Sequence, residues 1–296
     1  MAASTLAPPP LAPERPTGAR SARQELGWGG PGVYVVAVLL ILVMLAPVAY
    51  VVIGGFRTNA QITTDPSGWP DPWQAGNYVD VLSGDVFWRQ VLNSAFAAGA
   101  TTIGVVVLGL MASFAIARYR FVGRGGLYAL FAAGLMFPMT VAITPLYILV
   151  RTLGLMNDLW GVILPQIGFA LPTTIIILVP FLRAIPAELQ EAAAIDGCSR
   201  LGFFWRMVLP LSLPGVITVG ILAFIASWNS YLLPLFILND SDAFTLPLGV
   251  QAFSSEYSVD TAKVLAFTSL AMLPALLFFS LFERRIVGGL TGAVKG

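Results

Sequence analysis

The sequence ELQEAAAIDGCSRLGFFWRMVLPLSLP, residues 188–214, lies between strongly apolar segments and has the pattern of ordered helical structure. The proline just before it suits a helix start, because its missing N–H would have no intrahelical partner there. Glu188 and Glu191 fall in the first turns of that helix, where carboxylates favour the positive end of the helix dipole. Gly197 can adopt the left-handed conformation that closes a helix, and Ser199 can cap another. The stretch therefore predicts a helix, a tight glycine turn and a second helix that re-enters the membrane.

The chain around this stretch has the composition of an integral membrane protein. Of its 296 residues, 57% are hydrophobic and only 10% are charged, whereas soluble domains carry roughly 25% charged residues. The net charge of +1 suggests no nucleic-acid partner. The chain has no histidine, which excludes histidine-based catalysis and histidine-ligated metals. Its single cysteine, Cys198, excludes an intrachain disulfide or a multi-cysteine zinc site, so no metal site is expected.

Six apolar segments are long enough to cross a bilayer, so an all-α integral membrane fold with six transmembrane helices is expected. The fifth is too long for one span and is expected to bend near Pro214. The six segments cover about 33–56, 91–117, 127–150, 159–182, 208–238 and 264–282.

The expected domain boundaries follow from these segments. Residues 1–30, rich in Pro, Ala, Gly and Arg, are expected to form a disordered tail. The first span and the loop after it occupy 31–86. The polar stretch from Arg57 to Gln90 contains Trp69, Trp73, Tyr78 and Trp88, which suit a membrane–water interface. The transmembrane domain then covers 87–283, and 284–296 forms a C-terminal tail.

Arginine and lysine are distributed unequally between the two sides of the membrane. With six spans, the two tails and the loops 118–126 and 183–207 hold twelve of these residues, whereas the opposite loops hold four. Positive residues favour the cytoplasmic side of a membrane. Both termini and the loop around Gly197 are therefore expected in the cytoplasm.

Uncharged polar residues gather in three of the apolar segments: Asn93, Ser94, Thr101 and Thr102; Gln166, Thr173 and Thr174; and Ser227 to Tyr231. Hydrogen bonding between helices is the favoured interpretation for Asn93 and Ser94, and Ala95 with Gly99 offers small residues for close helix packing. An aromatic ring beside amides and hydroxyls suits a neutral, hydroxyl-rich ligand. The candidate substrate pathway, for which interhelical hydrogen bonding remains the alternative, consists of Gln166, Trp228, Asn229, Ser230 and Tyr231.

The spacing of Glu191-Ala192-Ala193, Gly197 and Met207-x-Leu209-Pro210 resembles the EAA loop of bacterial ABC importer permeases. Met207 stands where isoleucine is commoner in that family. The flanking Ile195-Asp196-Gly197 resembles the carbohydrate-uptake branch, and the terminus Gly289–Gly296 is similar to that of the maltose-type second permease subunit. Trp228-Asn229 is also similar to a pair in sugar permeases, although Ser230 replaces the commoner acidic residue.

This resemblance implies the type I ABC importer permease fold of the binding-protein-dependent transport system inner membrane component family, with a cytoplasmic EAA coupling helix in the loop 186–207. It implies a non-enzymatic permease subunit of the bacterial inner membrane that imports a sugar by alternating access. The implied partners are a homologous second permease subunit, two ATP-binding subunits and an extracytoplasmic sugar-binding protein. No cofactor is expected on this chain, because it lacks the G-x-x-x-x-G-K-[ST] motif, and ATP with magnesium would be held by the ATPase subunits.

The resemblance also implies which residues couple the permease to its ATPase. The coupling residues are Glu188, Glu191, Ala192, Ala193, Asp196, Gly197, Leu209 and Pro210, and Thr291 and Lys295 of the tail are expected to contact the ATPase. The alternatives are an importer of a non-sugar solute and a membrane scaffold without transport activity. An intramembrane enzyme or ion-coupled carrier is disfavoured, because no ionisable residue lies well inside any apolar segment.

Overall fold

The computed structural model describes residues 31–253 and 259–294, with side chains described as far as Phe282. Within these ranges the regular elements are helices. The expected disordered tail at 1–30 and the expected contact of Lys295 lie outside the described residues, as does the side chain of Thr291.

The chain divides into two units, Met1–Val48 and Ala49–Gly296. The described part of the first unit belongs to α1 (Pro31–Gly54), whose side chains from residue 31 to 47 are all exposed. The 24 residues of α1 extend about 36 Å, which exceeds the roughly 30 Å of a bilayer core. An exposed apolar helix of this length is suited to lipid rather than to water.

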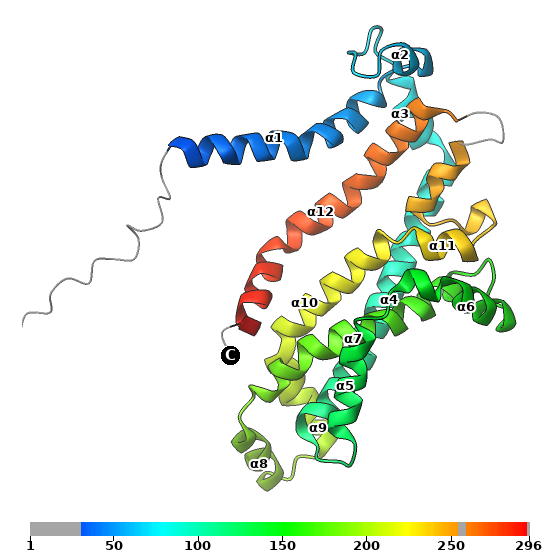
Figure 1. Cartoon of the computed structure of the whole chain (residues 1–296). Helices are drawn as coiled ribbons and strands as arrows, with labels where there is room; N and C mark the ends of the chain where they lie inside the picture. The colour runs from blue at the N-terminus through cyan, green and yellow to red at the C-terminus, as the bar shows by residue number, and fades with distance from the viewer. Residues whose placement is uncertain (1–30, 254–258, 295–296) are drawn as a thin grey trace, which may run out of the picture. The chain divides into compact units, whose positions relative to one another are not determined.

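The core of the second unit consists of four long helices: α4 (Asp85–Arg118), α7 (Leu159–Arg183), α10 (Leu209–Trp228) and α12 (Thr261–Val294) (Figure 1). Helix α4 packs against α7 and α10, and α10 also packs against α12. At Gly104 of α4, a Cβ atom would lie 2.4 Å from Ile167 Cδ1, so a larger residue there would displace the Ile167 side chain of α7. At Gly99, where the sequence also predicts close packing, a Cβ would meet nothing within 4 Å, so no other helix of the described chain approaches this position.

The third apolar segment is broken rather than straight. Helices α5 (Arg124–Gly134) and α6 (Met139–Thr152) meet at 102°, so the expected single span at 127–150 is a bent pair. Pro138 precedes α6 with an extended backbone (φ −74°, ψ 130°), and a proline disfavours helical geometry in the residue before it. Five described helices are long and apolar enough to cross a membrane, or six if this pair counts as one span.

The fifth apolar segment is interrupted at a different place from the one expected. A short helix, α9 (Arg200–Phe203), a π-helical turn, η2 (Phe204–Val208), and α10 follow one another, and the helix continues through Pro214. The interruption lies at Asn229–Tyr231, before α11 (Leu232–Ile237). Pro234 has no N–H to donate to the carbonyl of residue 230, so one helical hydrogen bond is missing at this interruption.

Helices α2 (Asn59–Thr64) and α3 (Gly76–Ser83) lie in the loop after α1, and α4 begins at Asp85, before the expected position. The buried guanidinium of Arg57, 2% exposed, organises this loop. It donates to the carbonyls of Gln61 (2.7 Å) and Pro66 (3.0 Å), and also to that of Asp65. One cation thus holds the end of α2 and the turn after it.

The segment between α11 and α12 is fastened to α4 by the polar residues predicted for helix contacts. It contains two 3-10 turns, η3 (Ser241–Ala243) and η4 (Leu246–Phe253). Asn93 Nδ2 donates to the carbonyls of Asp242 (2.9 Å) and Phe244 (3.0 Å), and Ser94 Oγ accepts from Leu246 N (2.7 Å). These residues therefore bind the backbone of a neighbouring segment, so their role here is structural.

The Arg57 contacts generate a prediction about stability. We expect Arg57→Gln to lower the apparent melting temperature of the purified chain by about 5 °C, because charge-assisted hydrogen bonds are lost from a buried site. Scanning fluorimetry in detergent measures this change. Arg151→Gln is the control, because Arg151 is exposed and forms no described ion pair. Equal melting temperatures for the two variants would contradict this role for Arg57.

Candidate functional site

The hairpin predicted around Gly197 forms as a helix closed by a glycine. Helix α8 (Ala187–Ile195) has Asp196 at its C-cap, and Gly197 follows with φ +72°. Gly197 N donates to Ala194 O (3.1 Å) and Cys198 N donates to Ala193 O (2.8 Å). These bonds form a Schellman motif, which satisfies carbonyls that the helix end leaves unpaired.

The second arm of the hairpin begins immediately after this closure. Ser199 caps α9, because its Oγ accepts from Gly202 N at 3.1 Å. The π turn η2 then leads into α10, where Leu209 N donates to Phe204 O across five residues. Pro210 follows directly, and its lack of an N–H is compatible with the shift from π to α geometry.

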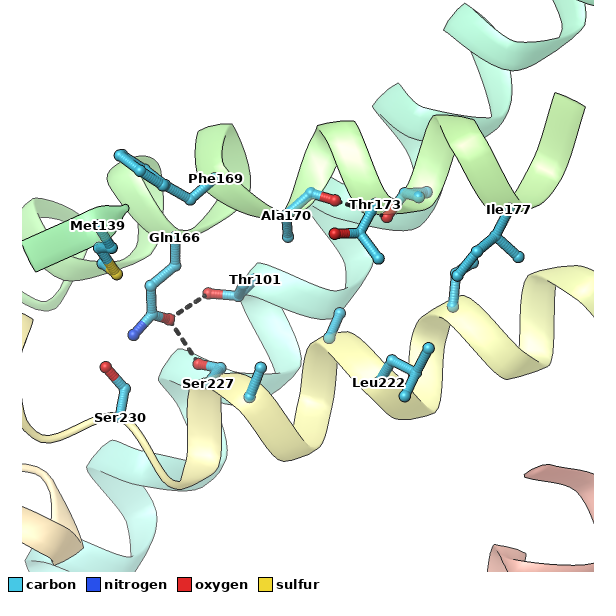
Figure 2. A pocket seen from close by; sticks show the side chains of 14 residues that line it. Thr101, Met139, Gln166, Phe169, Ala170, Thr173, Ile177, Leu222, Ser227 and Ser230 are labelled. Atoms are coloured by element: carbon cyan, nitrogen blue, oxygen red, sulfur yellow. Dashed lines mark hydrogen bonds between the residues drawn. The ribbon is translucent and has the colours of Figure 1, made fainter. Parts of the chain in front are cut away.

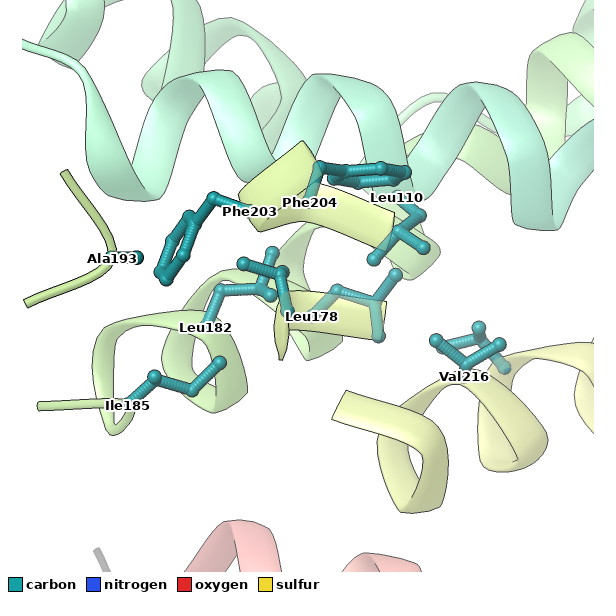
Figure 3. Close-up of a cluster of buried hydrophobic side chains, with 10 residues drawn as sticks. Leu110, Leu178, Leu182, Ile185, Ala193, Phe203, Phe204 and Val216 are labelled. Carbon is teal, nitrogen blue, oxygen red and sulfur yellow. The ribbon is translucent and has the colours of Figure 1, made fainter. Parts of the chain in front are cut away.

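An apolar cluster holds α8 against the ends of the long helices. Figure 3 shows Ala193 facing Phe203, with Leu182 and Ile185 of the segment before α8 beside them. Ala193 is only 7% exposed, and Leu189, one turn earlier, packs against the same cluster. A small residue at 193 lets α8 approach the cluster closely. Leu209 also packs against the cluster, whereas Pro210 is exposed.

The opposite face of α8 is free of contacts within the described chain. Glu188, Glu191, Ala192 and Ile195 are exposed, and their spacing of three, four and seven residues places them on one helix face. Ile195 is 86% exposed although it is fully apolar. The sequence prediction missed Ile195, but its position four residues after Glu191 would have placed it on this face.

A polar contact between three helices borders a cavity of about 380 Å³. Gln166 of α7 accepts two hydrogen bonds at Oε1, from Thr101 Oγ1 of α4 (3.1 Å) and Ser227 Oγ of α10 (2.6 Å), as Figure 2 shows. Its Nε2 has no described acceptor, and Ser230 lies beside it. The other walls are mostly apolar and include Met139 and Phe169. The cavity can therefore offer amide and hydroxyl groups to a neutral ligand within an apolar enclosure.

The structure brings only some of the predicted pathway residues to this cavity. Gln166 and Ser230 line it, together with Thr101, Thr173 and Ser227 of the polar clusters. Trp228 is 6% exposed, stacks on Phe224 with ring centroids 5.8 Å apart, and belongs to the same buried apolar cluster as Phe267 of α12. Its role in substrate contact stays a prediction.

Asn229 and Tyr231 also lie outside the cavity wall. The side chain of Asn229 donates to Ile225 O at 3.0 Å, and Tyr231 Oη lies 3.5 Å from Gln251 Nε2. The walls at Met139 and Phe169 were missed by sequence reasoning, because apolar residues in apolar helices carry no distinguishing signal. The described residues contain no group of acidic residues or cysteine placed to hold a metal ion.

Residues 105–288 match the family described as binding-protein-dependent transport system inner membrane component, and the chain belongs to this family. A diacetylchitobiose uptake system permease protein of Streptomyces coelicolor is 33% identical over 256 residues, covering 86% of this chain and 85% of that protein. A trehalose transport system permease protein of Mycobacterium tuberculosis is 40% identical, covering 74% of this chain and 81% of the relative.

A sulfoquinovosyl glycerol transport system permease protein of Agrobacterium fabrum is 32% identical, over 90% of this chain and 95% of that protein. Among solved structures, a chain of a bacterial ABC transporter involved in the import of the acidic polysaccharide alginate superimposes with a TM-score of 0.70. The two chains are 20% identical, and the match covers 91% of this chain and 99% of the other. This likeness establishes a shared fold, that of an ABC importer permease, as the sequence predicted.

The closure at Gly197 generates a prediction about local stability. A Cβ at this position would meet nothing within 4 Å, so the cost of a substitution arises from the backbone angle. We expect Gly197→Val to accelerate hydrogen exchange of the amides of Gly197 and Cys198 roughly tenfold, because a β-branched residue disfavours φ +72°.

Hydrogen-exchange mass spectrometry of a peptide that covers 187–203 measures the effect. Gly125→Val is the matched control, since Gly125 also has open space around its Cβ position but no positive φ. Unchanged exchange around Gly197 would show that the left-handed turn is not required for closure.

Proposed function

We propose that this chain is a permease subunit of an ATP-driven importer that takes up a sugar, with both termini and α8 in the cytoplasm. The observation that best supports this proposal is the hairpin at 187–203. Its first helix, α8, is closed by Gly197 and exposes one face to solvent. In Figure 1, α8 and α9 lie at the opposite end of the second unit from α2 and α3. The distribution of arginine and lysine favours the cytoplasm for the α8 end.

The exposed face of α8 suits contact with an ATPase subunit. The apolar side chain of Ile195 offers area to bury, while Glu188 and Glu191 offer charge to a partner. The packed face at Leu189 and Ala193 transmits movement of α8 to α7 and α10 through the apolar cluster. ATP binding to two partner subunits would then drive rigid-body movement of the spans between inward-facing and outward-facing states.

The cavity at Gln166 suits the substrate pathway. A sugar without charge requires hydrogen-bond donors and acceptors, and these are present as the free amide of Gln166 and the hydroxyl of Ser230. The two hydrogen bonds that Gln166 accepts from α4 and α10 hold three helices together at this point. Passage of a substrate would replace these contacts, so the same residues serve as substrate partners and as helix contacts.

The proposal is tested by purifying the complex on a tag at the N-terminus of this chain. We expect an ATPase and a second permease subunit to co-purify, and the ATPase activity to rise when a binding protein and its sugar are added. The panel includes mono- and oligosaccharides, glycerol phosphates and amino acids. Stimulation only by a non-sugar would retain the permease and reject the sugar, whereas absence of any ATPase would favour a membrane scaffold.

The exposed face of α8 generates a prediction about coupling. We expect Ile195→Asp to reduce substrate-stimulated ATPase activity at least tenfold, because a carboxylate replaces apolar area at the partner contact. Measurements use the reconstituted complex. Gln190→Ala, at a position off the exposed face, is the control. If Ile195→Asp leaves ATPase stimulation and uptake unchanged, this face of α8 does not contact the ATPase.

The cavity generates a prediction about transport. We expect Gln166→Leu to reduce uptake of the identified substrate by roughly tenfold or more while the complex still assembles, because one well-placed amide is removed from the path. Ser113→Ala is the control, since Ser113 is a buried polar residue of α4 that does not line the cavity. Uptake in proteoliposomes reports transport, and size-exclusion chromatography reports assembly. Normal uptake by Gln166→Leu would remove the cavity from the pathway.

A further inference from the structure

A second concave surface lies on the outside of the helix bundle, away from Gln166. It is an apolar groove of about 500 Å³ between α4 and the segment formed by α9, η2 and the start of α10. Its floor includes Leu110 and Phe204, and its rims include Val107, Met111 and Trp205. These three rim residues are 48%, 57% and 58% exposed, so the described chain leaves the groove open.

Positive charge gathers at one end of this groove, around Tyr119. The guanidinium of Arg200 lies over the Tyr119 ring, 5.3 Å from its centroid. Arg124 Nη1 donates to the carbonyl of Tyr119 at 3.3 Å. Among the described residues no carboxylate lies within 4.0 Å of either guanidinium. Two guanidinium groups that have no carboxylate partner among the described residues therefore lie at this end of the groove.

The dimensions of the groove correspond to one leaflet of a bilayer. Its α4 wall runs from Val106 to Tyr119, which is about 20 Å along the helix axis. One leaflet contributes about 15 Å of hydrocarbon to the membrane core. An acyl chain can therefore lie along the groove while its head group reaches Tyr119. Trp205 on the rim is an aromatic residue of the kind that gathers at membrane–water interfaces.

We propose that this groove binds an anionic phospholipid, whose acyl chain lies between α4 and η2 and whose phosphate contacts Arg200 and Arg124. The two arginines favour a lipid with a negatively charged head group, since basic pockets between membrane helices attract such lipids. The lipid would bridge the end of α4 and the π turn that leads from the α8 hairpin into α10. It would thereby stabilise the second arm of the hairpin independently of any substrate.

Native mass spectrometry of the full-length chain tests the proposal. The chain is titrated in detergent with phosphatidylglycerol and with phosphatidylcholine of the same acyl chains. We expect phosphatidylglycerol to bind roughly 30-fold more tightly, because each arginine at a lipid surface contributes about fivefold. In the double variant Arg124→Gln/Arg200→Gln, the preference should fall to within about twofold. Arg151→Gln is the control for loss of charge and should keep the preference.

A variant that fills the groove separates the acyl-chain contact from the charge contact. We expect Val107→Trp to reduce retention of phosphatidylglycerol at least tenfold, whereas Leu130→Trp, on the exposed surface of α5, should leave it unchanged. Circular dichroism and size-exclusion chromatography verify that each variant is folded.

Three outcomes would overturn the proposal. An unchanged lipid preference in the double arginine variant would show that the cations do not bind the head group. Binding of glycerol 3-phosphate as tightly as phosphatidylglycerol would show that the acyl chain contributes nothing. Retention of phosphatidylglycerol by the isolated chain but not by the assembled complex would identify the groove as a contact with another subunit.

Discussion

The fold depends on one constraint, which is that a bilayer core supplies no water to pair with backbone N–H and C=O groups. Long helices meet this constraint because their backbone N–H and C=O groups bond to each other within the helix. Hydroxyl side chains in these helices also find hydrogen-bond acceptors close by along the chain. Thr102, Thr174, Thr218 and Thr268 each donate to a carbonyl four residues earlier on their own helix. Ser212 does the same across the junction of η2 and α10, where it donates to Val208 O. A hydroxyl can donate a hydrogen bond to a carbonyl of its own helix. The larger amide of Gln166 instead accepts hydrogen bonds from side chains of α4 and α10.

The breaks in the apolar segments lie beside a cavity, where backbone N–H and C=O groups need not all be paired within a helix. Residues 135–138 interrupt the third segment, and residues 229–231 interrupt the fifth. Met139, directly after the first break, and Ser230, within the second, both line the cavity at Gln166. Irregular backbone at membrane depth is tolerated where it borders a cavity, since water or a ligand can then pair with the freed groups. The broken helices and the cavity are therefore one feature of the fold.

The hairpin at the other end of the bundle owes its form to local chemistry. Gly197 closes α8, Ser199 caps α9, and both contacts form within a few residues along the chain. Local signals of this kind can be recognised in a sequence because they do not depend on distant neighbours. The apolar cluster around Ala193 then attaches this local turn to the long helices, since α4, α7 and α10 also contribute side chains to it.

The sequence by itself determined the membrane class, the helical elements, the hairpin at Gly197 and the family, because apolar length, capping residues and motif spacing are local properties. It also named Gln166 and Ser230 among the candidate pathway residues. Only the tertiary structure decided that Trp228 is buried in an apolar cluster beside Phe224, that Gly104 rather than Gly99 makes a close helix contact within the described chain, and that the third segment bends at Pro138. Which face of a fully apolar helix meets protein, lipid or a cavity depends on its neighbours, and an apolar helix carries no polar face from which this could be predicted.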